Sequence, residues 1–266
     1  MIKNSLICCA ALLSGLACSE VTDTANPLTQ LLSEKMHFID LTHALSVDAP
    51  FWPSTASSPF RHDTLRAHPS GAPAMAAYAT PEHFGTHIDA PIHSGDHLLS
   101  VDQLMADDLF GPAAVIDVSV QCQDNPDYLL SKADILAWET THGPLPEGAI
   151  VLMATGWSKK WPDQAAYRNQ DVSKVMHFPG FSEQAGRFLI EERSIRGIGV
   201  DTFSIDFGPS QNFPVHKIVN GAGKYHLENV ANLHLLPAKG AYLIVAPIKI
   251  AGGSGGQVRI FAAVPE

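Results

Sequence analysis

Short runs of apolar residues, separated by polar and Gly- or Pro-rich stretches, are the main pattern of the chain. A run of about four to eight apolar residues between turn residues is typical of a buried strand. Such runs predict strands at residues 38–41, 113–118, 149–154, 197–200, 241–247 and 257–264.

Two segments carry the start signals of helices instead. Ser131 to Asp134 has the pattern of a capping box, and the helix that it begins is expected to run through Trp138. Ser182 is the expected N-cap of a second helix that extends to Arg193. Strands and helices alternate in the middle of the chain, and strand pairs lie at its ends. This order predicts an α/β fold with a mixed β-sheet core and flanking helices.

The segment between the first two predicted strands lacks periodicity. Phe51 and Trp52 stand between two prolines, which predicts a rigid aromatic loop. Residues 54–76 are rich in Pro, Ser and Ala and predict a long irregular loop. Loops of this length serve either as binding segments or as plain surface, and the sequence leaves both alternatives open.

The N-terminus has the pattern of an export signal. Lys3 supplies a positive charge, residues 6–16 are mostly apolar, and small residues precede Cys18. The apolar run is too short to span a bilayer as a helix. We therefore expect an exported, periplasmic protein. Its predicted parts are a signal peptide at residues 1–18, a linker at 19–37 and a single domain at 38–266.

Cys18 raises a lipoprotein alternative. If the cysteine after the cleavage site were acylated, the mature chain would stay tethered to the membrane through the lipid. Gly15 stands where a lipoprotein signal usually has Leu, so the match is imperfect and both forms of export stay open.

Composition and charge narrow the classes of function. With 266 residues, of which 45% are hydrophobic and 17% charged, the chain can bury a sizeable core. The formal net charge is -10 and no cluster of Lys and Arg occurs, which argues against a nucleic-acid partner. Cys8 and Cys9 would leave with the predicted signal, so the mature chain would keep Cys122 and at most Cys18, and no disulfide framework is expected.

The segment from His83 to His93 holds three histidines and one aspartate, and it predicts a metal site. Fully extended, the backbone from His83 to Asp89 would run about 20 Å, too far for the ligands of one ion. The chain is therefore expected to curl at Gly85 and to be extended at Asp89, with Pro91 stiffening the exit. The alternative is a loop of solvated histidines.

Other polar motifs carry weaker signals. Ser254 stands in a Gly-x-Ser-x-Gly sequence, but a nucleophile elbow needs a following helix, whereas a strand is predicted from Gln257. We interpret this stretch as a hairpin loop and disfavour a serine hydrolase. Asp201 and Asp206 follow a predicted strand, where they suit either turn chemistry or a site.

The pattern His-x-Gly-Thr-His-x-Asp-x-Pro-x-His resembles the signature of the metal-dependent cyclase-like hydrolases. That family includes bacterial kynurenine formamidase and isatin hydrolase. Supporting similarities cover nearly the whole predicted domain and lie at residues 38–42, 51–53, 111–118, 152–157, 199–206 and 227–229. The resemblance implies a cyclase-like (swivelling β/β/α) architecture and a homodimer.

The resemblance also implies roles for individual residues. His83, His87 and Asp89 would hold a divalent metal ion, Mn or Zn, and His93 would be the general acid and base. Phe51 and Trp52 would lie near the substrate.

The number of ions differs between the two branches of the family. In the kynurenine formamidase branch Asp89 would bridge to a second ion held by His216 and Glu228. The isatin hydrolase branch implies a single manganese ion. Relatives usually have a longer loop after His93; here Ser94 to His97 follows directly, and His97 is expected to be solvated.

These observations predict a metal-dependent amidohydrolase that cleaves the C–N bond of a small aryl amide. A bound divalent ion polarises a carbonyl group and lowers the pKa of water towards about 7, so no Ser or Cys nucleophile is needed. The substrate would be an isatin-like cyclic amide or N-formylkynurenine, and predicted export slightly favours the former. The alternative is a non-catalytic, exported metal- or ligand-binding protein with the same fold.

Overall fold

The computed structural model describes residues 35–53, 58–67 and 71–266. The predicted signal peptide, Cys18 and most of the predicted linker lie outside these residues. The first strand, β1 (Met36–Asp40), begins two residues before the expected start of the domain. Among the described residues no helix is long and apolar enough to cross a bilayer.

Seven strands close into a barrel, and this arrangement confirms the mixed α/β fold. Around the barrel they are β12 (Gly255–Pro265), β11 (Lys239–Pro247), β5 (Phe110–Asp117), β7 (Ala149–Ala154), β9 (Ile195–Val200), β10 (Tyr225–Glu228) and β4 (His87–Asp89). The ring closes because β4 pairs with both β10 and β12. β1 pairs with the C-terminal part of β12, on the edge of β12 whose N-terminal part pairs with β4. Neighbours from β5 to β10 are parallel, and the other pairs are antiparallel.

β7 explains why the strands are continuous apolar runs. Ala149, Val151 and Met153 pack against the helices, whereas Ile150 and Leu152 point to the barrel interior. Alternate side chains of a strand lie on opposite faces, so a strand buried on both faces must be apolar throughout.

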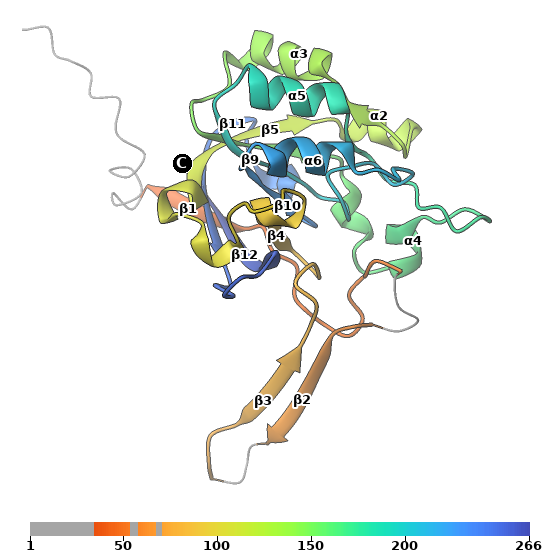
Figure 1. Ribbon diagram of the computed structural model, residues 1–266, viewed down its shortest axis with the longest axis vertical. Coiled ribbons are helices and arrows are strands. Elements are labelled where there is room, and N and C mark those ends of the chain that lie inside the picture. The colour runs from red at the N-terminus through yellow and green to blue at the C-terminus, as the bar shows by residue number, and fades with distance from the viewer. Residues whose placement is uncertain (1–34, 54–57, 68–70) are drawn as a thin grey trace, which may run out of the picture.

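Helices cover the outer face of the parallel strands (Figure 1). The two predicted helices are confirmed as α3 (Lys132–His142) and α5 (Glu183–Glu191), with the expected serine caps. The other α-helices within the described residues are α2 (Ser119–Asp124), α4 (Gln164–Arg168) and α6 (Pro214–Gly221). Short 3-10 helices lie at Pro91–His93 (η1), Val101–Gln103, Ala106–Leu109, Trp157–Lys160 and Leu233–Leu235, and a minor parallel pair joins β6 (Leu129–Leu130) to β8 (Gly180–Phe181).

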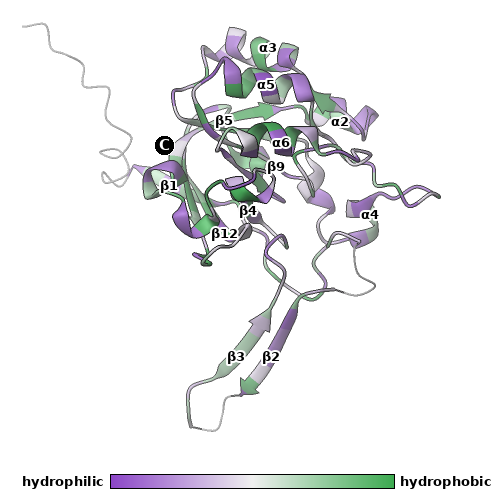
Figure 2. Ribbon diagram, viewed as in Figure 1, coloured by the Kyte–Doolittle hydropathy of each residue, from purple (hydrophilic) through white to green (hydrophobic). Residues whose placement is uncertain are grey.

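The expectation of an irregular loop at residues 54–76 is wrong. β2 (Arg61–Arg66) and β3 (Met75–Ala79) form an antiparallel hairpin that projects away from the barrel (Figure 1). β2 is mostly hydrophilic and β3 mostly hydrophobic (Figure 2). All the residues of both strands are exposed, so neither strand shows the apolar alternation by which a half-buried strand is recognised.

Candidate metal centre

The His83 to His93 segment curls and then extends, as its sequence predicts. Gly85 has a φ of +69°, a left-handed conformation that favours glycine. The Thr86 hydroxyl then anchors the turn, because it donates to the Asn229 carbonyl (2.7 Å) and accepts from the His43 amide (2.9 Å). Beyond the turn the chain enters β4, and η1 carries His93 back towards the same site.

Strand register brings a second segment to Asp89. In the antiparallel pair of β4 and β10, His226 lies opposite Asp89 and Glu228 lies opposite His87. Directly opposed residues point to the same face of a sheet. His226 and Glu228 therefore reach the side on which His87 and Asp89 lie.

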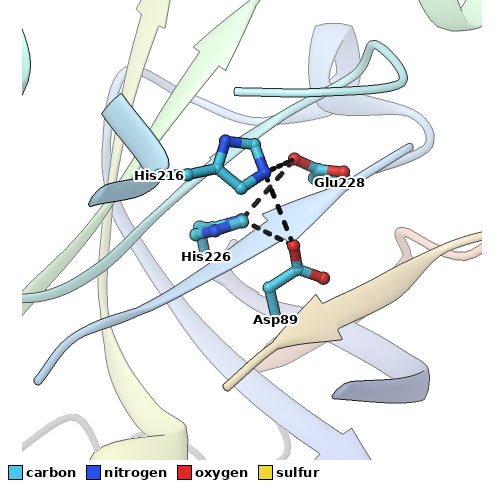
Figure 3. A group of neighbouring side chains, drawn as sticks. All are labelled: Asp89, His216, His226 and Glu228. Carbon is cyan, nitrogen blue, oxygen red and sulfur yellow. Dashed lines mark ion pairs between the residues drawn. The ribbon is translucent and has the colours of Figure 1, made fainter. Parts of the chain in front are cut away.

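α6 supplies a further imidazole. Pro214 occupies the start of the helix, and Asp206 accepts from the amides of Val215 and His216, both at 3.1 Å. The same carboxylate accepts from His216 Nδ1 at 2.7 Å, which directs His216 Nε2 towards Asp89 and Glu228 (Figure 3). Asp206 thus has an orienting role that the sequence left open.

Asp89 is the centre of the resulting cluster. Its Oδ1 lies 2.6 Å from His83 Nδ1 and 3.2 Å from His87 Nε2. Its Oδ2 lies at 3.5 Å from His93 Nε2 and His226 Nδ1 and at 3.7 Å from His216 Nε2. Two overlapping groups of ligand atoms therefore share this carboxylate: His83, Asp89 and His93 on one side, and Asp89, His216, His226 and Glu228 on the other.

The hydrogen bonds fix which ring nitrogens of His87 and His216 face the centre of the cluster. His87 Nδ1 lies 2.9 Å from the Gly85 carbonyl, an acceptor, so Nδ1 carries a proton and Nε2 is the nitrogen left to bind a cation, a second proton or a metal ion. Asp206 has the same effect on His216. Metal-binding histidines are oriented in this way, by an acceptor on the other ring nitrogen.

The buried atoms left without partners fit a cation. Among the described residues, His87 Nε2 and both ring nitrogens of His226 are buried with no hydrogen-bond partner. Buried polar groups are nearly always hydrogen-bonded or bound to metal. Imidazole and carboxylate ligands suit Zn and Mn alike, so the donor set fits a divalent ion without naming it.

The charges of the cluster agree with this interpretation. Burial opposes protonation of His87, but the neighbouring Asp89 and Glu228 outweigh it and raise the pKa of His87 to about 10. Burial likewise opposes ionisation of Asp89, yet His226 and His87 hold its pKa well below the ordinary value. Burial lowers the pKa of His93, so that its imidazole is neutral near pH 7. The buried carboxylates thus require positive charge beside them.

A cavity of about 220 Å³ opens onto the cluster. Phe51 and Trp52 both line it, so the structure places the pair expected near the substrate beside the His, Asp and Glu cluster. Trp52 is 37% exposed and packs edge-on against Phe203 at 6.2 Å between ring centroids. Phe51 is largely buried beneath the Arg168 guanidinium.

The structure brings together all six predicted residues of the metal site and its acid-base partner. His97 lies apart, with its side chain 93% exposed. His226 is the residue that sequence reasoning missed. A His-x-Glu pair on a strand places both side chains on one face, and this spacing before Glu228 was the available signal.

Comparisons with known proteins agree with the fold and the motif. The family model described as "Putative cyclase" matches residues 39–207. Isatin hydrolase from Roseibium aggregatum is 38% identical over 193 residues, which are 70% of this chain and 73% of the relative. Kynurenine formamidases of several bacteria match 84% of the chain at 25% to 28% identity.

Solved structures of isatin hydrolases are similar to this chain over most of its length. Isatin hydrolase A from Labrenzia aggregata, bound to benzyl benzoate, superposes with a TM-score of 0.84 at 40% identity, over 91% of this chain and all of that one. An isatin hydrolase bound to the product analogue thioisatinate superposes with a TM-score of 0.82 at 34% identity, over 90% of this chain and 97% of the other. This chain therefore belongs to the cyclase family, whose members include isatin hydrolases and kynurenine formamidases.

Proposed function

We propose that this protein is a metal-dependent amidohydrolase that opens the ring of an isatin-like cyclic aryl amide. The observation that carries the proposal is the juxtaposition of the buried His, Asp and Glu cluster with an aromatic cavity. The cavity can bind a flat ring, and the cluster lies at its floor, where a carbonyl group of that ring would be hydrolysed.

When bound, a divalent ion polarises the scissile carbonyl and activates water. The residues proposed to hold it are His83, His87 and Asp89, with His216, His226 and Glu228 on the other side of Asp89. Two overlapping ligand groups support positions for one or two ions, and the donor set supports Mn or Zn.

His93 is proposed as the proton carrier. It lines the cavity, is 30% exposed, and its Nε2 faces Asp89 Oδ2 at 3.5 Å. Hydrolysis adds hydroxyl to the carbonyl carbon, breaks the C–N bond and adds hydrogen to the nitrogen. A neutral imidazole at this place can take the proton from water and return it to the leaving nitrogen, which stays attached to the opened product.

The aromatic wall supports a planar substrate. Trp52, Phe203 and Phe84 each contribute a ring to the lining of the cavity, and Trp52 packs edge-on against Phe203. Stacked or edge-on contacts between rings add about 0.5 to 1.5 kcal/mol beyond burial of area. The similarity to isatin hydrolases, one of which binds a product analogue, favours isatin over N-formylkynurenine.

A substrate comparison tests this choice. The purified chain, loaded separately with Mn and Zn, is offered isatin and N-formylkynurenine, and kcat/KM is measured for each. We expect isatin to be hydrolysed with the higher kcat/KM. A preference for N-formylkynurenine would assign the protein to the kynurenine formamidase branch. Hydrolysis of neither substrate would favour the alternative, a non-catalytic metal- or ligand-binding protein.

Export and dimerisation are further parts of the proposal. Export rests on the N-terminal pattern of Lys3 and residues 6–16, with a lipid tether at Cys18 as the alternative form. Fractionation of cells expressing the full chain, with globomycin to block lipoprotein processing, separates the two forms. Homodimerisation is supported by the exposed hairpin of β2 and β3, which an isolated chain would have to maintain without packing.

A further inference from the structure

The Gly-rich stretch 252–256 lies against the metal centre, although it is no nucleophile elbow. β12 begins at Gly255, so a strand and not a helix follows Ser254. The Ser254 hydroxyl nevertheless lies 2.9 Å from His83 Nε2, on the side of the ring opposite Asp89.

Glu82 determines the direction of this hydrogen bond. Its Oε2 accepts from the Ser254 hydroxyl (2.6 Å) and from the Ser254 amide (3.0 Å). The single hydroxyl proton therefore points at Glu82, and the Ser254 oxygen accepts from His83 Nε2. In the neutral ring His83 Nδ1 then carries no proton, and it faces Asp89 Oδ1 at 2.6 Å. Two acceptors at this distance need a cation between them, which is either a proton on the doubly protonated ring or a bound metal ion.

The flanking glycines allow this approach. A Cβ on Gly255 would lie 2.7 Å from His83 Cε1 and 2.5 Å from the Ile88 carbonyl oxygen. A Cβ on Gly253 would lie 2.9 Å from Glu82 Oε1. At Gly255 the clash includes a backbone oxygen that cannot move aside, so glycine is required there, and a side chain at Gly253 would displace the Glu82 carboxylate from its place beside Ser254.

We propose that Glu82 and Ser254 are positioning residues, which hold His83 in the tautomer that offers Nδ1 to the metal beside Asp89. The inference rests on the proposed metal site. It adds two residues, Glu82 and Ser254, that orient a metal ligand from outside the segment of His83 to His93. It also gives the Gly-Ser-Gly sequence a role, since the serine supplies the acceptor and the glycines supply the space.

The same atoms resemble a Ser-His-Asp triad, and the proton direction separates the two interpretations. In a triad the histidine accepts the serine proton. Here Glu82 accepts it. Ser254 is also absent from the residues that line the cavity, whereas His83 lines it.

The test is the affinity of the metal-free full chain for Mn and for Zn, measured by calorimetric titration. Ser254→Ala and Glu82→Ala should each weaken binding by about 10- to 100-fold, the usual effect of losing the partner of a metal-binding histidine. Glu82→Gln keeps a carbonyl acceptor for the serine and should restore most of the affinity. Ser100→Ala is the matched control, because Ser100 donates to Asp102 (2.6 Å), Asp102 anchors the Gly252 amide of the same loop, and neither touches a ligand.

The outcomes are distinguishable. Weaker binding in Ser254→Ala with unchanged binding in Ser100→Ala supports the inference. Wild-type affinity in both Ser254→Ala and Glu82→Ala overturns it and leaves the proposed function intact. A wild-type chain that binds neither metal overturns the proposed function and the inference with it. Should Ser254→Ala fail to fold, Glu82→Ala and its Glu82→Gln rescue decide.

Discussion

Asp89 concentrates the chemistry of the site in a single side chain. It is 1% exposed, and five imidazole groups approach its two oxygens. A buried carboxylate in such surroundings stays ionised and attracts cations. His93 is the one neighbour for which we assign proton transfer rather than metal binding.

Replacement of His93 tests that assignment. His93→Ala should reduce kcat by about 10² to 10⁴-fold, the usual contribution of a general acid and base. The metal content of the purified protein should stay unchanged, because the other ligands remain. Because His93 also belongs to a candidate ligand group, elemental analysis is the deciding measurement: loss of metal in His93→Ala would make it a ligand.

His43 predicts a pH dependence of stability that is independent of catalysis. Its ring stacks on Trp161 at 4.1 Å, its Nε2 is buried, and burial lowers its pKa from 6.5 to about 4. Below pH 6.5 His43 is protonated in the unfolded chain, whereas in the native protein it binds a proton only near pH 4. The free energy of unfolding should therefore fall as the pH drops from 6.5 to 4, by at most about 3 kcal/mol from this group.

His43→Phe keeps the stacked ring and removes the titration. Urea unfolding of both metal-free proteins between pH 4 and 7 should show a flatter profile for the variant. Parallel profiles would contradict the assignment.

Sequence predicts the residues of this site where their grouping is local. His83, Gly85, His87 and Asp89 lie within one turn and one short strand, so spacing and backbone preferences are sufficient. His226 approaches Asp89 only through strand pairing between distant segments, and Asp206 matters only because α6 begins beside it. The spacing of His226 and Glu228 can show that the two share a face of a strand, but the sequence does not show which distant segment that face meets, nor where α6 begins relative to Asp206.

At the scale of elements, α6 is the part whose placement the site depends on most. Asp206 holds both the first turn of the helix and the ring of His216. Asp206→Asn removes one charged acceptor and should weaken Mn or Zn binding by about 10- to 100-fold. Asp171→Asn is a matched control, because Asp171 accepts from the backbone amides of Ser173 and Val175 and lies near His177, far from the cluster. Equal metal affinity in both variants would refute the orienting role.

The β2–β3 hairpin is the element whose exposure predicts a partner chain. Leu65, Met75 and Tyr78 are each at least 50% exposed, and an isolated hairpin has marginal stability in water. The double variant Leu65→Asp and Tyr78→Asp should convert a dimer into a monomer, measured by light scattering after size exclusion. Val120→Asp on α2, which is 69% exposed, should leave the mass unchanged. A monomeric wild-type protein would contradict the proposed dimer.

The elements that the sequence predicts are those with an uninterrupted apolar run or a recognisable helix cap. β7 has its predicted bounds, and α3 and α5 begin at their predicted serine caps, because apolar runs and serine caps mark these points. The helix ends are less well predicted: α3 continues four residues beyond Trp138, and α5 ends two residues before Arg193. β10 was missed because two of its four residues are site residues, which interrupt the apolar run. The hairpin was missed because neither of its faces is buried.

At the scale of the whole molecule, closure of the barrel creates the site. β4 is only three residues long, and it closes the ring by pairing with β10 on one edge and β12 on the other. Through these pairs His226 and Glu228 come from one neighbour, while the loop before the other brings Ser254. The apolar pattern indicated the strands but not their order, so the closed barrel could not be predicted.

The central claim is that this cluster holds a divalent ion on which amide hydrolysis depends. The most direct test is to strip the metal with a chelator, remove the chelator, and titrate Mn or Zn back while isatin hydrolysis is followed by absorbance. We predict that activity disappears on stripping and returns in proportion to bound metal, reaching its maximum at one or two ions per chain. Hydrolysis that persists in the metal-free protein would contradict the claim.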